Sequence, residues 1–563
     1  MKKHYLKITA FLLGAIMLGF TSCDDDDNSG ETQKPTLVSA SVESDNSEAI
    51  VYFSEGLYKN DDKTGALDAT SLSVTLSGGT LSLTDYTINH TAGGNSAIIG
   101  LTLSDEATEG SETLTISVSA TSAYDEAGNA IEAGSVTASL NPVDAEIVPE
   151  EKALSAYELE GKEGLPADYV SVLKSHFTEN NNVISELSIA ADNLIPAAGE
   201  AGNGVAAADS WFDAVTYQGA FEPGGSNWAE GWTLMYGHSG TTATNEITVS
   251  ANITTDTEWT KDNVYLLDGF IFVEDGATLT IEAGTMIQGM AGQEENASAL
   301  VVKMGGKLMA QGTATEPIVF TADGDQYDGS GFGKEVRGLW GGLIMLGKAT
   351  TNNSTQTRIE GIPEAFDAYY GGTDDADNSG VIQYVSIRHG GTDIGQGNEI
   401  NGLTLGGVGN GTTIDHVEVI ANVDDGVEFF GGAPDLKNIL VAYCGDDSYD
   451  YDEGYHGRGQ FWVTIQSDEA GDRLGEHDGG SGDDEEAEPY AKPVIYNATY
   501  VGNGNGTCIT FRDNAGGTYA NSIFVNTNKG IEVEFRNDKH NSYQMLTEEH
   551  LTLKNNLFIG TGF

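Results

Sequence analysis

The chain has 563 residues, with 26 basic against 86 acidic side chains and only three cysteines. Its formal net charge of −60 repels nucleic acid and anionic lipid headgroups, so a nucleic-acid-binding protein is excluded, whereas divalent cations or cationic partners suit such a surface. The 73 glycines and 11 prolines indicate many turns without a collagen-like or disordered composition, and the length allows two or more domains.

The first 22 residues have the pattern of an export signal. Three lysines within the first seven residues precede a short apolar stretch at 8–20, which is too short for a permanent membrane span. Thr21 and Ser22 then lead to Cys23, and this order resembles a bacterial lipobox, although Phe20 stands where leucine is usual. We therefore expect a lipoprotein signal peptide over 1–22 and lipidation, including palmitate, at Cys23, whose acyl chains anchor the protein in a membrane.

An acidic run at 24–27 follows the cysteine directly and opens a polar tether at 23–34. Such a run resembles the surface-export signal of Bacteroidota lipoproteins; the alternative is a solvated linker. The resemblance implies a location in the cell envelope, lipid-anchored to the outer membrane and exposed at the cell surface.

Residues 35–143 predict a small β-sandwich, because runs of alternating apolar residues are separated by turns of Asn, Gly and Asp. The segments VYFSEGLY and AYDEAGNAIEAG resemble the Ig-like domain of bacterial surface-layer proteins, which implies a spacer without chemistry of its own. Residues 144–205 then predict a linker with short helices. From 206 the chain is aromatic, and we expect Trp211, Phe212, Trp228 and Trp232 to cap the core of the next domain rather than stack on a sugar.

Short apolar strands with Gly or Asn turns recur from about residue 246, within a domain that we assign to 206–563. The segment HVEVIANVDDGVEFFGG at 416–432 aligns with NILVAYCGDDSYDYDEG at 438–454, in a step typical of one coil of a parallel β-helix. Alternation predicts that Leu403, Val427, Tyr449, Ile509 and Ile531 stack inward. The residue after each then points outward; these are Thr404, Glu428, Asp450, Thr510 and Glu532.

The motifs RGLWGGLIMLG, YVSIRHGGT, DDGVEFFGG and GDDSYDYDEGYHGRGQFW together resemble a family of Bacteroidota surface lipoproteins. The resemblance implies a pectin-lyase-like, right-handed parallel β-helix over roughly 205–563, and an all-β protein when the preceding sandwich is included. It implies no catalytic residue. The last segment, KNNLFIGTGF, ends on an apparent mid-coil strand, which predicts an uncapped or truncated C-terminus.

Three interpretations of the acidic coils stay open. Stacked carboxylates suit a hard cation, calcium in particular, although the EF-hand order is absent. The second interpretation is catalysis: paired carboxyls suit a glycoside hydrolase, and calcium with a nearby arginine or lysine suits a lyase. The third is structural, because acidic residues at turns cap their own backbone. The metal candidates are Asp424, Asp425, Asp446, Asp447, Asp450, Asp452 and Glu453, and the catalytic candidates are Glu428, Asp450 and Arg512.

Two further expectations concern the same region. We interpret GEHDGGSGDDEEAEPY at 475–490 as an acidic loop, with His477 a loop residue, and expect Tyr449, Tyr451 and Tyr455 to become exposed sugar platforms if the register differs by one residue. The leading hypothesis is a non-catalytic surface lipoprotein that binds an extracellular glycan or an envelope partner, with calcium. The alternatives are a polysaccharide lyase or hydrolase and a structural or adhesive envelope component.

Overall fold

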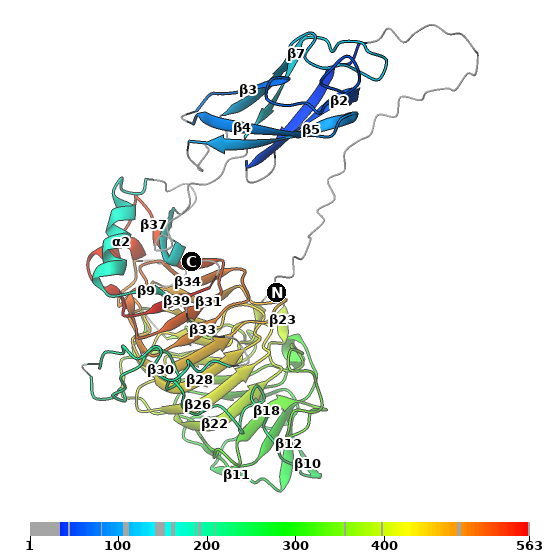
Figure 1. The fold of residues 1–563 in the computed structure, drawn as a ribbon. Helices are drawn as coiled ribbons and strands as arrows, with labels where there is room; N and C mark the ends of the chain where they lie inside the picture. Colours follow the sequence, from blue (N-terminus) through cyan, green and yellow to red (C-terminus); the bar gives the residue numbers. More distant parts are fainter. Residues whose placement is uncertain are drawn as a thin grey trace. The chain divides into compact units, whose positions relative to one another are not determined.

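The computed structural model contains two compact units, 1–146 and 147–563 (Figure 1). The described residues run from 34 to 560, without 43–45, 80, 105–111, 141–151, 159–163, 186, 188, 190–192, 208, 354–355, 396–397 and 481–485. The expected signal peptide, Cys23 and the acidic tether up to residue 33 lie outside them. Within the described part, no helix is long and apolar enough to cross a membrane.

The first unit is a sandwich of two antiparallel sheets, as expected. Val51 and Ile99 from one sheet and Ile116 from the other are wholly buried in a shared core. Asp125 accepts the backbone N–H of Asn129 at 2.7 Å and so closes a turn within the segment AYDEAGNAIEAG. The first sheet contains β1 (Leu37–Val42), β2 (Glu48–Leu57), β5 (Gly94–Leu103) and β4 (Leu83–His90), and the second contains β3 (Leu72–Ser77), β6 (Thr113–Val118) and β7 (Gly134–Ser139).

The second unit is a parallel β-helix, which confirms the all-β prediction. Its ten-stranded sheet runs in the order β13 (Phe270–Val273), β16 (Ala299–Val302), β19 (Leu343–Leu346), β25 (Leu403–Gly406), β27 (Val427–Phe430), β29 (Tyr449–Asp452), β31 (Arg473–Asp478), β34 (Thr507–Arg512), β37 (Lys529–Phe535) and β8 (Leu154–Glu158). Every neighbouring pair in this sheet is parallel.

An eighteen-stranded sheet supplies the other walls of the solenoid. Its strands are β10 (Asn245–Val249), β11 (Thr257–Trp259), β12 (Asn263–Leu267), β14 (Thr278–Ile281), β15 (Met286–Gly289), β17 (Lys307–Gln311), β18 (Ile318–Ala322), β22 (Gly380–Arg388), β26 (Thr413–Ile420), β28 (Asp435–Ala442), β30 (Arg458–Ile465), β32 (Val494–Tyr496), β33 (Thr499–Val501), β35 (Gly517–Ala520), β36 (Ile523–Val525), β38 (Leu551–Lys554), β39 (Leu557–Ile559) and β9 (Val183–Ser185). Short elements in the loops are η1 (Glu294–Asn296), β20 (Thr357–Arg358), β21 (Tyr369–Tyr370), β23 (Asp393–Gly395), β24 (Asn398–Glu399) and α3 (Ser542–Thr547).

The predicted inward stack forms the core between the sheets. Leu403, Val427, Tyr449, Ile509 and Ile531 are all wholly buried. Each such side chain stabilises the fold by about 1.5–3 kcal/mol through the apolar surface it removes from water. The side chain that follows each of them therefore has to face outward, because strand residues alternate between the two faces.

The segment expected to be a linker at 144–205 instead closes the C-terminal end of the solenoid. Strand β8 pairs with β37, strand β9 pairs with β39, and helix α2 (Tyr169–Glu179) lies between them in sequence. The buried side chain of Asn182 donates to the carbonyl of Leu553 at 2.8 Å and accepts from the side-chain amide of Asn556 at 3.0 Å. The expectation of an uncapped end is therefore wrong, because a cap can come from a segment that is distant in sequence but adjacent in space.

The aromatic segment that follows covers the flank of the solenoid, not its end. Phe221 and Trp232 are buried, and this cover packs against Leu440 and Val463 on the outer face of the eighteen-stranded sheet. The indole of Trp211 lies under the ammonium of Lys437, at 4.7 Å. We call the segment that contains Phe221 and Trp232 the flank cover. It is needed because several outward positions on this sheet are apolar.

Candidate functional site: an acidic outer face

The outward side chains of the ten-stranded sheet form a continuous line across consecutive coils. Glu428 lies opposite Thr404 and Asp450, and Asp450 lies opposite Glu476 on β31. We call Glu428, Asp450 and Glu476 the carboxylate row. Beyond it the line continues through Thr510 and Glu532. The predicted outward set is thus aligned, with Glu476 added between Asp450 and Thr510.

Strand β31 corrects the expected loop at 475–490. Residues 473–478 form a strand of the ten-stranded sheet, and His477 is a core residue stacked on Tyr451 with ring centroids 3.8 Å apart. Its Nε2 lies 2.8 Å from the hydroxyl of Tyr519, and burial lowers its pKa to about 3. The alternation of side chains in GEHD could have indicated this strand. The step from the preceding coil is 26 residues rather than 22, however, so the strand does not align with the repeat.

The three tyrosines considered as sugar platforms are also core residues. Tyr449, Tyr451 and Tyr455 are buried, and their hydroxyls donate to backbone carbonyls inside the solenoid. These three rings are therefore not available for stacking on the outer face of these coils.

The turn that precedes the row adds a second line of acids. Asp425 accepts the backbone N–H of Asp447 at 2.9 Å, and Asp447 accepts the backbone N–H of Arg473 at 2.6 Å. Both carboxyls are almost fully buried, at 6% and 2% exposure. These bonds give the turn acids a structural role in joining successive coils, whereas the interpretation above expected them to cap their own turns.

Several of these carboxylates lie close enough to share one ion. One oxygen each from Asp425, Glu428 and Asp450 lie within 4.8 Å of one another, and the same holds for Asp447, Asp450 and Glu476. At this separation, a pair of like charges costs about 3 kcal/mol for an effective dielectric constant of ~20. Two further groups with the same spacing lie in the turns and contain Asp424, Asp425 and Asp446, and Asp446, Asp447 and Asp472.

Burial and mutual repulsion both oppose ionisation in the row. Burial raises the pKa of Glu428 and Asp450 well above the usual range, and the neighbouring carboxylates raise the pKa of each further. The pKa of Asp425 is raised for the same two reasons. Either protons or a cation must therefore neutralise this part of the face.

The amide of Asn401 is directed at this group. Asn401 is 3% exposed, its Nδ2 donates to Glu428, and its Oδ1 has no hydrogen-bond partner among the described residues. One oxygen of Asp450 is likewise buried without a partner in that part of the chain. Buried polar atoms are rarely left unpaired, so these two oxygens are the unused acceptors at this end of the row. Amide and carboxylate oxygens are the atoms that calcium prefers.

Two of the expected metal ligands lie outside these groups. Asp452 occupies the other outward column of β29, and Glu453 accepts the hydroxyl of Tyr370 at 2.5 Å. Glu453 therefore binds the loop that contains Tyr370. Neither Asp452 nor Glu453 belongs to a three-acid group within the described part of the chain.

Two arginines border the carboxylate row. The guanidinium of Arg473 lies 2.8 Å from Glu476, and that of Arg512 lies 3.0 Å from the same oxygen. Arg512 also holds Asp478 in a two-bond contact at 2.5 and 2.9 Å. Burial works to lower the pKa of Arg512, but the hydrogen bond and the charge of Asp478 outweigh it and raise this pKa above its ordinary value.

A shallow cavity of about 510 Å³ continues the face toward the capped end. Its cationic side chains are Arg473, Arg512 and Lys529, and Tyr157 reaches it from β8. The sequence identified Arg512 but missed Arg473, because its strand was interpreted as a loop, and missed Tyr157, because its segment was interpreted as a linker. The other lining residues are Thr507, Thr510, Asp513, Glu532 and Glu534.

Comparison with known proteins agrees with this architecture. The family described as a pectate-lyase-like β-helix domain matches residues 251–561. The chain belongs to this family. The match covers the carboxylate row and the three cationic residues of the adjoining cavity, so the acidic face is part of a pectate-lyase-like β-helix.

No curated protein matches the chain. Among solved structures, the N-terminal part of the bacterial S-layer protein SbsC is similar at 21% identity over 19% of this chain and 24% of that chain, with a TM-score of 0.15. The matched part thus spans about a quarter of that N-terminal part.

Proposed function

We propose that the outer face of the ten-stranded sheet binds an acidic extracellular polysaccharide through a bound divalent cation, with calcium the expected ion. The observation that carries the proposal is the juxtaposition of the carboxylate row with a cavity that contains three basic side chains. A pectate-lyase-like β-helix fits a glycan-binding or glycan-degrading role.

The choice of a divalent cation rests on the carboxylate row and on Asp425 in the turn before it. Asp425, Glu428 and Asp450 offer carboxylate oxygens within 4.8 Å of one another, and the side-chain amide of Asn401 donates to Glu428 beside them. Calcium takes six to eight oxygen ligands, so these residues leave coordination positions for water or for a sugar carboxylate.

The choice of an acidic polymer rests on the basic side chains next to the row. An acidic sugar that shares the cation on the row would extend its next carboxylates toward Arg473, Arg512 and Lys529. Guanidinium groups bind carboxylates in a two-bond geometry, as Arg512 already does with Asp478. Each of these cations already pairs with an acid of the protein, so an acidic sugar would add a further carboxylate to them.

Binding is better supported than catalysis. A lyase needs a base that accepts a proton from the sugar, but the acids beside Arg473 and Arg512 raise the pKa of both guanidiniums and keep them protonated. A hydrolase needs an accessible acid, and Glu428 is 7% exposed and held by Asn401. Both observations argue against Arg512 and Glu428, two of the three catalytic candidates, as reacting groups.

The test uses purified residues 24–563 with calcium or chelator and a panel of acidic and neutral polysaccharides. Calorimetry is expected to show calcium binding to the protein alone and calcium-dependent binding of an acidic polymer, both lost in the double variant Glu428→Gln, Asp450→Asn. Glu246→Gln, an exposed acid on β10, is the matched control. Soluble oligosaccharides detected by mass spectrometry would establish an enzyme instead, and the absence of both binding and products would leave a structural or adhesive role.

We also propose that lipidation at Cys23 anchors this face outside the outer membrane. The support is the lipobox-like order before Cys23 and the acidic run after it. Cys23→Ser is expected to move the protein from the membrane fraction to the soluble fraction. Protease treatment of intact cells tests surface exposure, and protection of the wild-type protein would place it on the inner face of the membrane.

A further inference from the structure

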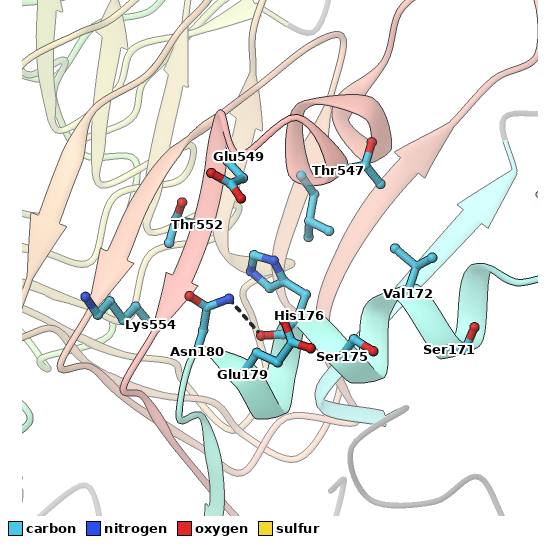
Figure 2. A pocket seen from close by; sticks show the side chains of 11 residues that line it. Ser171, Val172, Ser175, His176, Glu179, Asn180, Thr547, Glu549, Thr552 and Lys554 are labelled. Carbon is cyan, nitrogen blue, oxygen red and sulfur yellow. Dashed lines mark hydrogen bonds between the residues drawn. The ribbon is translucent and has the colours of Figure 1, made fainter.

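A second cavity, of about 680 Å³, lies on the seam between the cap and the last coil (Figure 2). One wall is helix α2 with Asn180, and the other contains residues 546–554, so the two walls are separated by more than 360 residues of sequence. Cavities that hold small ligands typically measure about 300–1,000 Å³. This cavity is not part of the acidic face, since the two share no lining residue.

Hydrogen bonds fix the two walls against each other before any ligand binds. Nε2 of His176 accepts the backbone N–H of Leu553 at 3.2 Å, and the backbone carbonyl of Asn180 accepts the backbone N–H of Asn555 at 2.8 Å. Burial lowers the pKa of His176 to about 4, so its imidazole is neutral at physiological pH. Because Nε2 accepts, the proton must lie on Nδ1, and His176 contributes an uncharged donor to the cavity.

The remaining lining is rich in hydroxyl groups: those of Ser171 and Thr547 donate to backbone carbonyls and can still accept, and those of Ser175 and Thr552 can donate and accept. Figure 2 shows the hydroxyls of Ser171 and Ser175 on the helix and those of Thr547 and Thr552 on the opposite wall. The apolar lining is limited to Val172 and Leu546. Such a surface matches a ligand that is covered with hydroxyl groups and does not match an apolar ligand.

The charges around the cavity select against an anion. Glu179 and Glu549 supply two carboxylates and Lys554 one ammonium, on a protein whose net charge is −60. Carboxylates accept from sugar hydroxyls, and the ammonium donates to them. The acidic polymer proposed for the other face would be repelled here.

We propose that this seam cavity binds a neutral saccharide through hydrogen bonds from both walls. The ligand contacts α2 and β38 together, so its binding holds the cap on the solenoid. The site is independent of the carboxylate row and needs no cation.

The test uses residues 24–563 and a panel of neutral oligosaccharides, with uronic acid and amino-sugar oligosaccharides of equal length as comparators. Calorimetry in chelator is expected to find a neutral oligosaccharide that binds, with amide exchange slowed at 169–185 and 551–559. The double variant Ser175→Ala, Thr552→Val is expected to weaken binding by about tenfold, the loss of two hydrogen bonds. Thr518→Val is the matched control, because Thr518 lies opposite Thr552 on the preceding coil and does not line the cavity.

Glu549→Gln provides a second variant at an exposed position, where folding is not at risk. It is expected to weaken the binding of the neutral ligand and to leave calcium binding at the carboxylate row unchanged. The proposal is overturned if no neutral oligosaccharide binds, if uronic acid or amino-sugar oligosaccharides bind better, or if the cavity variants bind as the wild type does. Loss of binding in Glu428→Gln, Asp450→Asn would also overturn it, by assigning the neutral sugar to the acidic face.

Discussion

Asp425 accepts the backbone N–H of Asp447, which lies 22 residues later in sequence and one coil away in space, at 2.9 Å. The bond joins two acids that repel each other, so one residue both stabilises the turn and adds charge to it. Substitutions at Asp425 can separate these two effects.

Asp425→Asn is expected to stabilise the protein at pH 7, because it keeps an acceptor for Asp447 and removes a buried carboxyl whose ionisation the folded state opposes. Asp425→Ala leaves a buried N–H unpaired and is expected to cost about 1–3 kcal/mol in the free energy of unfolding. Urea denaturation in chelator measures both. Equal destabilisation by the two variants would show that the charge, not the hydrogen bond, matters at this position.

The raised pKa of Asp513 is expected to make the stability of the protein depend on pH. Burial, followed by the charges of Asp478 and Glu534, raises the pKa of Asp513 to about 7. An aspartate in an unfolded chain titrates near ~3.9. The folded state therefore binds the proton more tightly, and this contribution to stability is complete below pH ~4 and is lost as the pH rises through about 7.

Asp513→Asn is therefore expected to raise the unfolding temperature at pH 7 to 8 and to leave it nearly unchanged at pH 4. Asparagine also tolerates the positive φ of 49° at this position. Thermal scans across this range check the slope, and an unchanged difference between variant and wild type at all pH values would contradict the assigned pKa.

Asn182 fastens the cap, and its removal is expected to loosen the C-terminal end. Asn182→Ala removes the bonds to Leu553 and Asn556 and leaves buried groups unpaired, at a cost of about 1–3 kcal/mol. Hydrogen exchange should accelerate in β38, β39 and α2 but not in β27 or β29. Asn193→Ala, at an exposed site, serves as the control.

Glu418 holds the flank cover. Its two carboxylate oxygens accept the backbone N–H groups of Leu234 and Met235, each at 2.8 Å, inside a buried network that contains Arg388. Glu418→Gln can accept only one of these bonds and removes the charge facing Arg388, so a loss of about 3–5 kcal/mol is expected. Faster proteolysis within 228–240 would locate the effect, and the exposed Glu230→Gln should behave as the wild type.

The sequence by itself determined the solenoid and the alignment of its acids. Alternation has a period of two in a strand, so the stacking of Val427 on Tyr449 also placed Glu428 over Asp450. A regular step between two coils was enough to predict this, because parallel strands in one sheet repeat the same orientation.

Only the tertiary structure decided which segments complete the face and close the ends. Coils of unequal length hid β31, so neither Glu476 and Arg473 at the site nor His477 in the core was predicted. The cap pairs β8 with β37 across most of the chain, which no local pattern encodes. Local periodicity specifies the direction in which a side chain points, whereas pairing between distant segments depends on which exposed strand edges and apolar surfaces remain to be covered after the coils have formed.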